Sequence, residues 1–256
     1  MTLIVPVLSQ KCLRWYSAQP LAVRWLPVEL GNRSMSLSEP LVADSEVVCD
    51  VAVVGAGPAG LMVAEQLAQA GLSVRVFETK ASAARKFLMA GKGGLNLTHS
   101  EEFASFVTRY GSRTEELTPW LQHWGAEELK AWAKSLGFDT FVGTSGRVFP
   151  ADMKAAPLLR AWLVRMKAQG VKFHMRHRWL GWDADGKPVL QTEDAKVKVD
   201  CKAFVLATGG ASWARLGSDG AWASLLEGKG VDLAPLQAAN CGFDVGGAQG
   251  RAAGWS

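Results

Sequence analysis

The sequence predicts an α/β fold organised around a Rossmann-like β-α-β unit. Three observations support this prediction: an apolar run at residues 47–54, a glycine pattern at residues 55–60, and a second apolar run at residues 72–77 that ends at Glu78. Runs such as "VVCDVAVV" are typical of parallel strands that are buried on both faces. A G-x-G-x-x-G motif with a strand before it, a helix after it and an acid at this distance indicates a dinucleotide site rather than a simple turn.

Each glycine of the motif has a separate task. Gly55 allows the tight turn, Gly57 lets backbone approach a pyrophosphate, and Gly60 lets the helix pack on the strand. A proline fits the first helical turn, because its missing N–H would have no intrahelical partner. We expect the phosphates at the helix N-terminus, where free N–H groups and the helix dipole favour negative charge. The expected cofactor-binding residues of this motif are Gly55, Ala56, Gly57, Pro58, Ala59 and Gly60.

The helix and the second strand complete the unit. Leu61, Ala64 and Leu67 recur with helical spacing, and Gly71 is placed to end the helix. Glu78 then closes the second strand, where a carboxylate can accept hydrogen bonds from both hydroxyls of an adenosine ribose. The same carboxylate would repel a 2′-phosphate.

A second glycine cluster follows in "KFLMAGKGGLNLTHSEEF". Gly91, Gly93 and Gly94 leave backbone open to close approach by a ligand, and Asn96 and Thr98 add hydrogen-bonding groups. The alternative is a glycine loop that only turns the chain. A neighbouring histidine, His99, fits a surface or capping position better than the role of a base.

The middle of the chain predicts helices and then a small antiparallel sheet. Residues 101–137 show helical periodicity, with their tryptophans expected in packing positions, and "FDTFVGTSGRVFP" predicts a hairpin. A helix at about 157–169 precedes a β meander at 171–206. The last strand of the meander runs directly into Ala207, Thr208, Gly209 and Gly210, a second stretch of bare backbone that we expect at the cofactor.

The pairing of an early G-x-G-x-x-G motif with a late A-T-G resembles the two-dinucleotide-binding flavoproteins, whose cofactor is FAD. A classical NAD dehydrogenase would continue with regular βαβ units of roughly thirty residues. Residues 79–200 do not show that pattern.

Four longer motifs resemble one particular family among these flavoproteins. "KFLMAGKGGLNLTHSE", "GRVFPADMKAAPLLRAWL", "ATGGASWARLGSDGAW" and "APLQAANCGFDV" resemble the BaiN-like/RsdA-like family of NAD(P)/FAD-dependent oxidoreductases, over about 47–245. The resemblance implies that the chain binds FAD and passes reducing equivalents from NAD(P)H to an unidentified small molecule. It places Ala207–Gly210 at the nucleotide, and it implies a flavin-side lining formed by Lys86, Gly91, Gly93, Gly94, Asn96, Leu97 and Thr98. It nominates no catalytic acid or base.

Composition narrows the classes of protein to which this chain could belong. A chain of 256 residues with 48% hydrophobic content is globular, and its net charge of +4 is spread without basic runs, which disfavours nucleic-acid binding. The four cysteines show no C-x-x-C spacing, so we expect no metal site and no disulfide framework, which fits a reducing cytoplasm. No apolar run approaches the roughly 18 residues of a membrane span. Nothing in the sequence predicts the oligomeric state.

The two ends differ from the predicted FAD-binding domain at 47–240. We expect residues 1–46 to be a poorly ordered N-terminal extension, and residues 241–256 to begin a second domain that is cut short. Members of the resembled family are longer, so we also expect the fold to be incomplete at the C-terminus. Two alternatives stay open: a truncated, non-catalytic nucleotide-binding remnant, and a flavoenzyme that acts on RNA.

Overall fold

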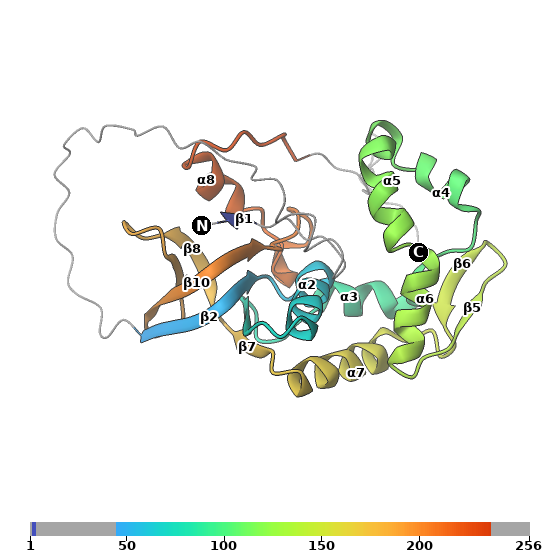
Figure 1. Cartoon of the computed structure of the whole chain (residues 1–256), viewed down its shortest axis with the longest axis horizontal. Coiled ribbons are helices and arrows are strands. Elements are labelled where there is room, and N and C mark those ends of the chain that lie inside the picture. Colours follow the sequence, from blue (N-terminus) through green and yellow to red (C-terminus); the bar gives the residue numbers. More distant parts are fainter. Residues whose placement is uncertain (1, 4–44, 237–256) are drawn as a thin grey trace, which may run out of the picture.

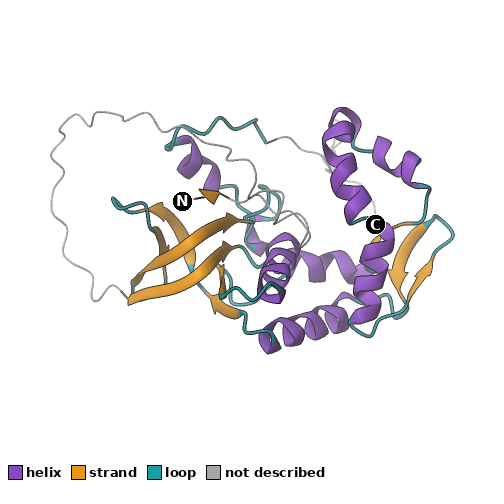
Figure 2. Ribbon diagram, in the orientation of Figure 1, coloured by secondary structure: helices purple, strands orange, loops and turns teal. Residues whose placement is uncertain are grey.

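A computed structural model describes residues 2–3 and 45–236, and within them a central β-sheet carries helices on one face and a smaller layer on the other (Figures 1 and 2). The strand order is β7-β3-β2-β10-β9-β8, and the short β1 also pairs with β10. The strands are β1 (Thr2–Leu3), β2 (Ser45–Val54), β3 (Val74–Glu78), β7 (Lys172–Met175), β8 (Arg178–Trp182), β9 (Pro188–Gln191) and β10 (Lys196–Leu206).

Strand β10 joins the two halves of this sheet. It runs parallel to β2 along almost its whole length, and β2 and β3, then β3 and β7, are also parallel pairs. At its other edge the start of β10 pairs antiparallel with β9, and β9 pairs antiparallel with β8. One long strand is therefore both the end of the meander and a central strand of the Rossmann-like sheet.

Both faces of the parallel strands are apolar, as a doubly covered sheet requires. On one face Val53 packs against helices α2 (Pro58–Gln69) and α7 (Ala155–Ala168). On the other face Val54 and Phe77 pack with Trp179 of β8 and with α8 (Trp222–Glu227). Figure 1 shows α2 in front of β2 and β10, and α7 continuing away from the sheet.

A helical lobe is inserted between β3 and β7, away from the sheet (Figure 1). Its three-stranded antiparallel sheet has the order β4-β6-β5. The elements from β3 to α7 are α3 (Arg85–Ala90), η1 (Gly91–Gly93), β4 (Thr98–His99), α4 (Phe103–Thr108), η2 (Gly111–Arg113), α5 (Thr114–His123), α6 (Ala126–Ser135), β5 (Thr140–Val142) and β6 (Arg147–Pro150).

The structure confirms the Rossmann-like α/β prediction, the hairpin and the helices within 101–137. One expectation was wrong in detail. The meander comprises β8, β9 and β10 alone, because residues 172–175 pair in parallel with β3. At the second glycine cluster the structure has α3 and a turn of 3₁₀ helix, for which the sequence analysis made no prediction.

Several expectations fall outside the described residues. Of the predicted extension at 1–46, the structure describes residues 2–3, which pair with β10, and the start of β2. The predicted second domain at 241–256 lies outside the described part of the chain. Within residues 2–3 and 45–236, no helix is long and apolar enough to cross a membrane, and no group of three His, Cys, Asp or Glu side chains is arranged to hold a metal ion.

A buried carboxylate attaches the lobe to the sheet. Glu65 of α2 is fully buried, and its Oε2 accepts hydrogen bonds from the indole N–H of Trp132 at 3.0 Å and of Trp162 at 2.9 Å. Arg165 Nη2 lies 2.6 Å from Glu65 Oε1, and its Nη1 donates to the hydroxyl of Ser135. Three helices, α2, α6 and α7, are thus connected through one charged group. The sequence analysis predicted a packing role for Trp132 but did not identify its partner Glu65.

We expect Glu65→Leu to reduce the free energy of unfolding by about 3–5 kcal/mol, because it leaves the Arg165 guanidinium and two indole N–H groups without their partner. Urea unfolding followed by circular dichroism measures the change. The matched control is Glu127→Gln, whose ion pair with Lys130 is on the surface and should change stability by less than about 1 kcal/mol. Equal effects of the two substitutions would contradict the role given to Glu65.

Candidate functional site

A cavity of about 630 Å³ opens where β2, β3 and β10 end at their carboxyl edge. In open α/β sheets this edge is where ligands bind, and the volume is in the range of small-molecule and cofactor sites. The cavity wall combines the glycine turn after β2, the end of β3, the start of α3, and the segment between β10 and α8.

Two of the motif glycines are required by packing. Gly55 has a φ of +102°, its N–H donates to the Phe77 carbonyl at 2.8 Å, and a Cβ on it would overlap the Ala207 carbonyl oxygen. A Cβ on Gly60 would overlap the Gly55 carbonyl oxygen. The tight turn and the close helix–strand packing predicted for these two positions are therefore confirmed.

Gly57 is different, because nothing lies within 4 Å of the Cβ position on this residue. It is the N-cap of α2, it lines the cavity, and no side chain caps the helix. Pro58 occupies the first turn as predicted. Uncapped N–H groups at the start of a twelve-residue helix are a favourable place for an anion that approaches along the open side of Gly57.

Glu78 is held rigidly at the end of β3. Its Oε2 accepts the Ala56 N–H at 3.0 Å, and its Oε1 accepts the Lys80 N–H at 2.9 Å. Each carboxylate oxygen can accept more than one hydrogen bond, so the group keeps acceptor capacity toward the cavity that it lines. A fixed carboxylate beside the glycine turn matches the position expected for ribose recognition.

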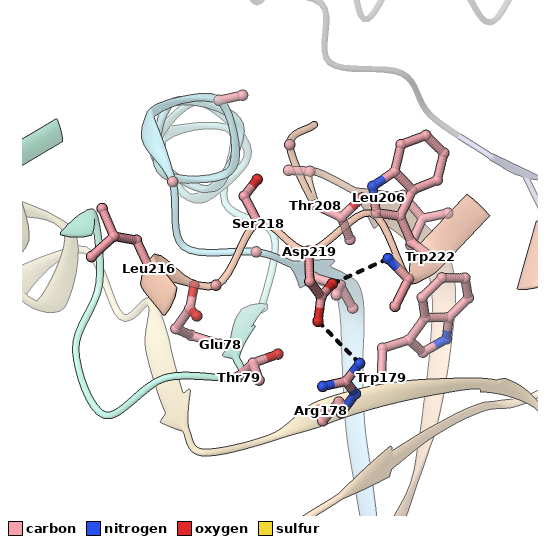
Figure 3. Close-up of a pocket in the computed structure, with 18 of the residues that line it drawn as sticks. Glu78, Thr79, Arg178, Trp179, Leu206, Thr208, Leu216, Ser218, Asp219 and Trp222 are labelled. Carbon is pink, nitrogen blue, oxygen red and sulfur yellow. Dashed lines mark hydrogen bonds and ion pairs between the residues drawn. The ribbon is translucent and has the colours of Figure 1, made fainter. Parts of the chain in front are cut away.

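Further residues of the cavity wall had no role assigned from the sequence. Figure 3 shows the side chain of Arg178 of β8 pointing toward Asp219, with Trp179 and Trp222 close by. Arg178 Nη2 lies 3.2 Å from Asp219 Oδ2, and the Ala221 N–H donates to Asp219 Oδ1. The Ala221 N–H, followed by Arg178, holds the pKa of the Asp219 carboxyl below its usual value.

Ser218 anchors this wall to the end of β10. Its side chain is only 3% exposed, and its hydroxyl donates to the Gly210 carbonyl at 2.8 Å. The neighbouring Gly209 has a φ of +73°, and a Cβ there would lie 2.8 Å from the Ser218 hydroxyl oxygen. The bare backbone of the A-T-G-G stretch is thus needed for packing as well as for ligand approach.

The structure brings together about half of the predicted site residues. Those that line the cavity are Gly55, Gly57, Pro58, Ala59, Glu78, Lys86, Ala207, Thr208 and Gly209. Ala56, Gly60 and Gly210 lie directly behind them and bond to or pack against the lining residues.

The second glycine cluster lies outside this cavity. Gly93, Gly94, Asn96, Leu97 and Thr98 belong to the lobe: Gly94 packs on Met153 and Phe149, the Leu97 N–H donates to the Val148 carbonyl, and Thr98 pairs in β4. His99 accepts the Glu101 N–H at Nδ1, which agrees with a capping role.

The pairing of Arg178 with Asp219 had no local signal in the sequence. These two residues meet from positions 41 residues apart, which no spacing rule predicts. Asp219 lies within the motif "ATGGASWARLGSDGAW", but the resemblance assigned it no role. Among the residues that the structure describes, no cysteine or histidine lines the cavity.

Comparison with known proteins gives two curated relatives. The chain is 28% identical over 192 residues to the ribosomal RNA dihydrouridine synthase of Haemophilus influenzae, which covers 73% of this chain and 46% of that protein. It is 37% identical over 67 residues to the thiamine thiazole synthase of Pyrococcus horikoshii, covering 26% of this chain and 27% of that protein. The chain therefore spans about half the length, or less, of the curated relatives it matches.

Among solved structures, the chain is similar to 3-ketosteroid-Δ4-(5α)-dehydrogenase from Rhodococcus jostii RHA1. The TM-score is 0.49 at 17% sequence identity, over 66% of this chain and 47% of that one. In addition, residues 49–251 match the family described as HI0933-like protein Rossmann domain. That match covers most of the chain and agrees with the resemblance found in the glycine motifs: the chain belongs to the HI0933-like Rossmann-domain family.

Proposed function

We propose that the cavity binds FAD and that the chain is the FAD-binding part of an oxidoreductase. One observation carries the proposal: the open backbone of Gly57, the carboxylate of Glu78 and the backbone of Thr208–Gly209 face the same cavity. The first of these groups suits the diphosphate of a dinucleotide and the second suits its ribose. The third is backbone along which the nucleotide can lie.

The topology favours FAD over a resident nicotinamide nucleotide. After β3 the chain enters the helical lobe instead of a further βαβ unit, and β10 returns beside β2 through an antiparallel meander. Glu78 also disfavours a 2′-phosphate at the ribose, so NADPH is a poor candidate for the resident ligand. We propose that NAD(P)H serves as the electron donor and that the acceptor is an unsaturated or carbonyl-like small molecule.

Bound FAD would supply the hydride-transfer chemistry, and the residues of this chain would supply binding and orientation. Gly57 and the first turn of α2 would hold the diphosphate, and Glu78 would hold the ribose. Trp179 and Trp222 would exclude water from the nucleotide side. The activity of the whole protein is part of the proposal, because the chain spans about half of its relatives.

The first test is the visible absorption spectrum of the purified chain, with any released cofactor identified by mass. We expect flavin bands and near-stoichiometric FAD in the parent protein. Gly57→Val should lose most of the bound FAD, because the side chain would block charge-assisted hydrogen bonds worth about 1.5–3 kcal/mol each, or on the order of tenfold or more in affinity. Its fold should persist, since the Cβ position is open and the backbone conformation is ordinary.

Two further glycines serve as comparisons in that experiment. Gly60→Val should fail to fold, because its Cβ overlaps backbone. Gly93→Val is sterically as free as Gly57→Val, so its FAD content reports whether the second glycine cluster takes part in binding. A colourless parent protein that takes up no added FAD, or unchanged FAD in Gly57→Val, would refute the assignment of the motif.

A second candidate is favoured by one specific observation, the similarity to a ribosomal RNA dihydrouridine synthase. Under this proposal the acceptor is a uridine in RNA instead of a small molecule. The formal net charge of +4 gives only weak electrostatic support.

If RNA is the acceptor, the FAD-loaded protein should retain ribosomal RNA in a strongly salt-dependent way, because phosphate contacts release counterions. Incubation of unmodified ribosomal RNA with NADPH should then raise its dihydrouridine content, measured by nucleoside mass spectrometry. A reaction without NADPH is the control. Weak, salt-insensitive retention of ribosomal RNA, with no gain in dihydrouridine, would contradict the RNA proposal and favour a small-molecule acceptor.

A further inference from the structure

Helix α3 forms part of the cavity wall but depends on the rest of the fold for its position. Its first two residues, Arg85 and Lys86, line the cavity. The helix is six residues long, no side chain caps it, and none of its residues is buried. Helices this short are at best marginally stable in isolation, so tertiary contacts must decide how α3 lies.

Both ends of α3 are attached to other elements. The N–H of Ala84, the residue before the helix, donates to the Ala56 carbonyl at 2.8 Å. At the far end, Gly91 lies so close to α7 that a Cβ on it would be 2.5 Å from the Ala155 Cβ. These contacts fix where α3 starts and ends, but they leave the rotation of the helix about its own axis to its side chains.

The side chain that packs α3 against the core is Phe87. It lies against the buried cluster that α2 and α7 share, and its ring meets the Trp162 ring edge to face, with centroids 6.5 Å apart and an interplanar angle of 63°. Aromatic pairs in this arrangement stabilise a structure beyond the burial of their area. Because Phe87 directly follows Lys86, this contact determines which side of α3 faces the cavity.

Trp162 can hold Phe87 because the orientation of its own ring is fixed. Its side chain is 2% exposed, and its indole N–H donates to Glu65 Oε2 at 2.9 Å. The Trp132 ring packs against it with centroids 4.8 Å apart and an interplanar angle of 80°. Glu65 belongs to α2, so three side chains, Glu65, Trp162 and Phe87, connect α2 with α3.

We propose that Trp162 is a positioning residue of the cavity. Anchored by Glu65, its ring holds Phe87 and so sets which way the start of α3 faces relative to the start of α2. All three side chains lie outside the cavity lining, so their effect is on the geometry of the wall and should appear as a change in ligand affinity. This inference rests on the proposed nucleotide function.

Two measurements on the full chain test this role: hydrogen exchange of the amides at 85–90, and FAD affinity from the quenching of flavin fluorescence. We expect Phe87→Ala to speed this exchange and to weaken FAD binding, each by about three- to tenfold, because it removes one aromatic pair. Trp162→Phe keeps a ring but removes the indole N–H, and it should act in the same direction. Phe87→Tyr retains the ring and should behave as the parent protein.

The matched control is Val148→Ala in β6. It removes apolar volume from a fully buried position of the lobe, outside the cluster that contains Trp162. At a temperature where every variant is folded, it should leave exchange at 85–90 and FAD affinity unchanged. A purely structural role would lower FAD affinity in step with stability, so equal losses in Val148→Ala and Phe87→Ala overturn the inference.

The two measurements also separate this inference from the proposed function. A parent protein that binds no FAD overturns the nucleotide proposal; in that protein, faster exchange at 85–90 in Phe87→Ala still supports the attachment of α3, and unchanged exchange refutes it. Where the parent protein does bind FAD, unchanged FAD affinity in Phe87→Ala overturns the role given to Trp162, whether or not exchange becomes faster.

Discussion

The contact between the glycine turn after β2 and the end of β10 determines the rest of the site. Gly55 packs so closely on the Ala207 backbone that no side chain fits at position 55. The Ala207 N–H also donates a hydrogen bond to the Val54 carbonyl. Because Gly60 packs in turn on Gly55, the position of α2 depends on the same contact. The cavity exists because two turns without bulky side chains meet at the ends of adjacent parallel strands.

This arrangement explains why Glu78 needs no dedicated partner of opposite charge. The Ala56 N–H that it accepts belongs to the glycine turn, and the Ala84 N–H donates to the carbonyl of that same Ala56. The backbone of Ala56 thus positions both the Glu78 carboxylate, which we propose to bind the ribose, and the start of α3. A change at the turn would therefore move the expected ribose and diphosphate groups together, which is the behaviour of a preorganised site.

Local patterns in the sequence predicted the parts of this site that lie close together along the chain. The glycine motif, Pro58 and Glu78 were found because their spacing is set by one β-α-β unit. The strand at 172–175 was assigned to the wrong partner because its parallel pairing to β3 joins positions almost a hundred residues apart. Helix α3 was not predicted, because it is only six residues long and is followed directly by the glycines at 91–94.

The charged pairs that join distant parts of the chain were predictable neither from spacing nor from composition. Glu65 lies on the apolar side of α2 and looks like an ordinary polar residue of an amphipathic helix, yet its partners Trp162 and Arg165 are about a hundred positions away. The Arg178 and Asp219 pair presents the same difficulty. A single sequence shows which residues can be charged, but the fold decides which charges meet and which are left for a ligand.

The residues assigned in this chain bind the cofactor, so membership of the family says little about which acceptor is reduced. Every residue assigned to the nucleotide comes from the ends of β2, β3 and β10, the start of α3, or the wall between β10 and α8. None of these residues would have to change for the acceptor to change from a small molecule to a nucleobase in RNA. Function resides in sites added to a fold, and a cofactor-binding half shared by many chemistries constrains the electron carrier far more than the acceptor. Similarity confined to this half therefore supports FAD more strongly than it supports either acceptor.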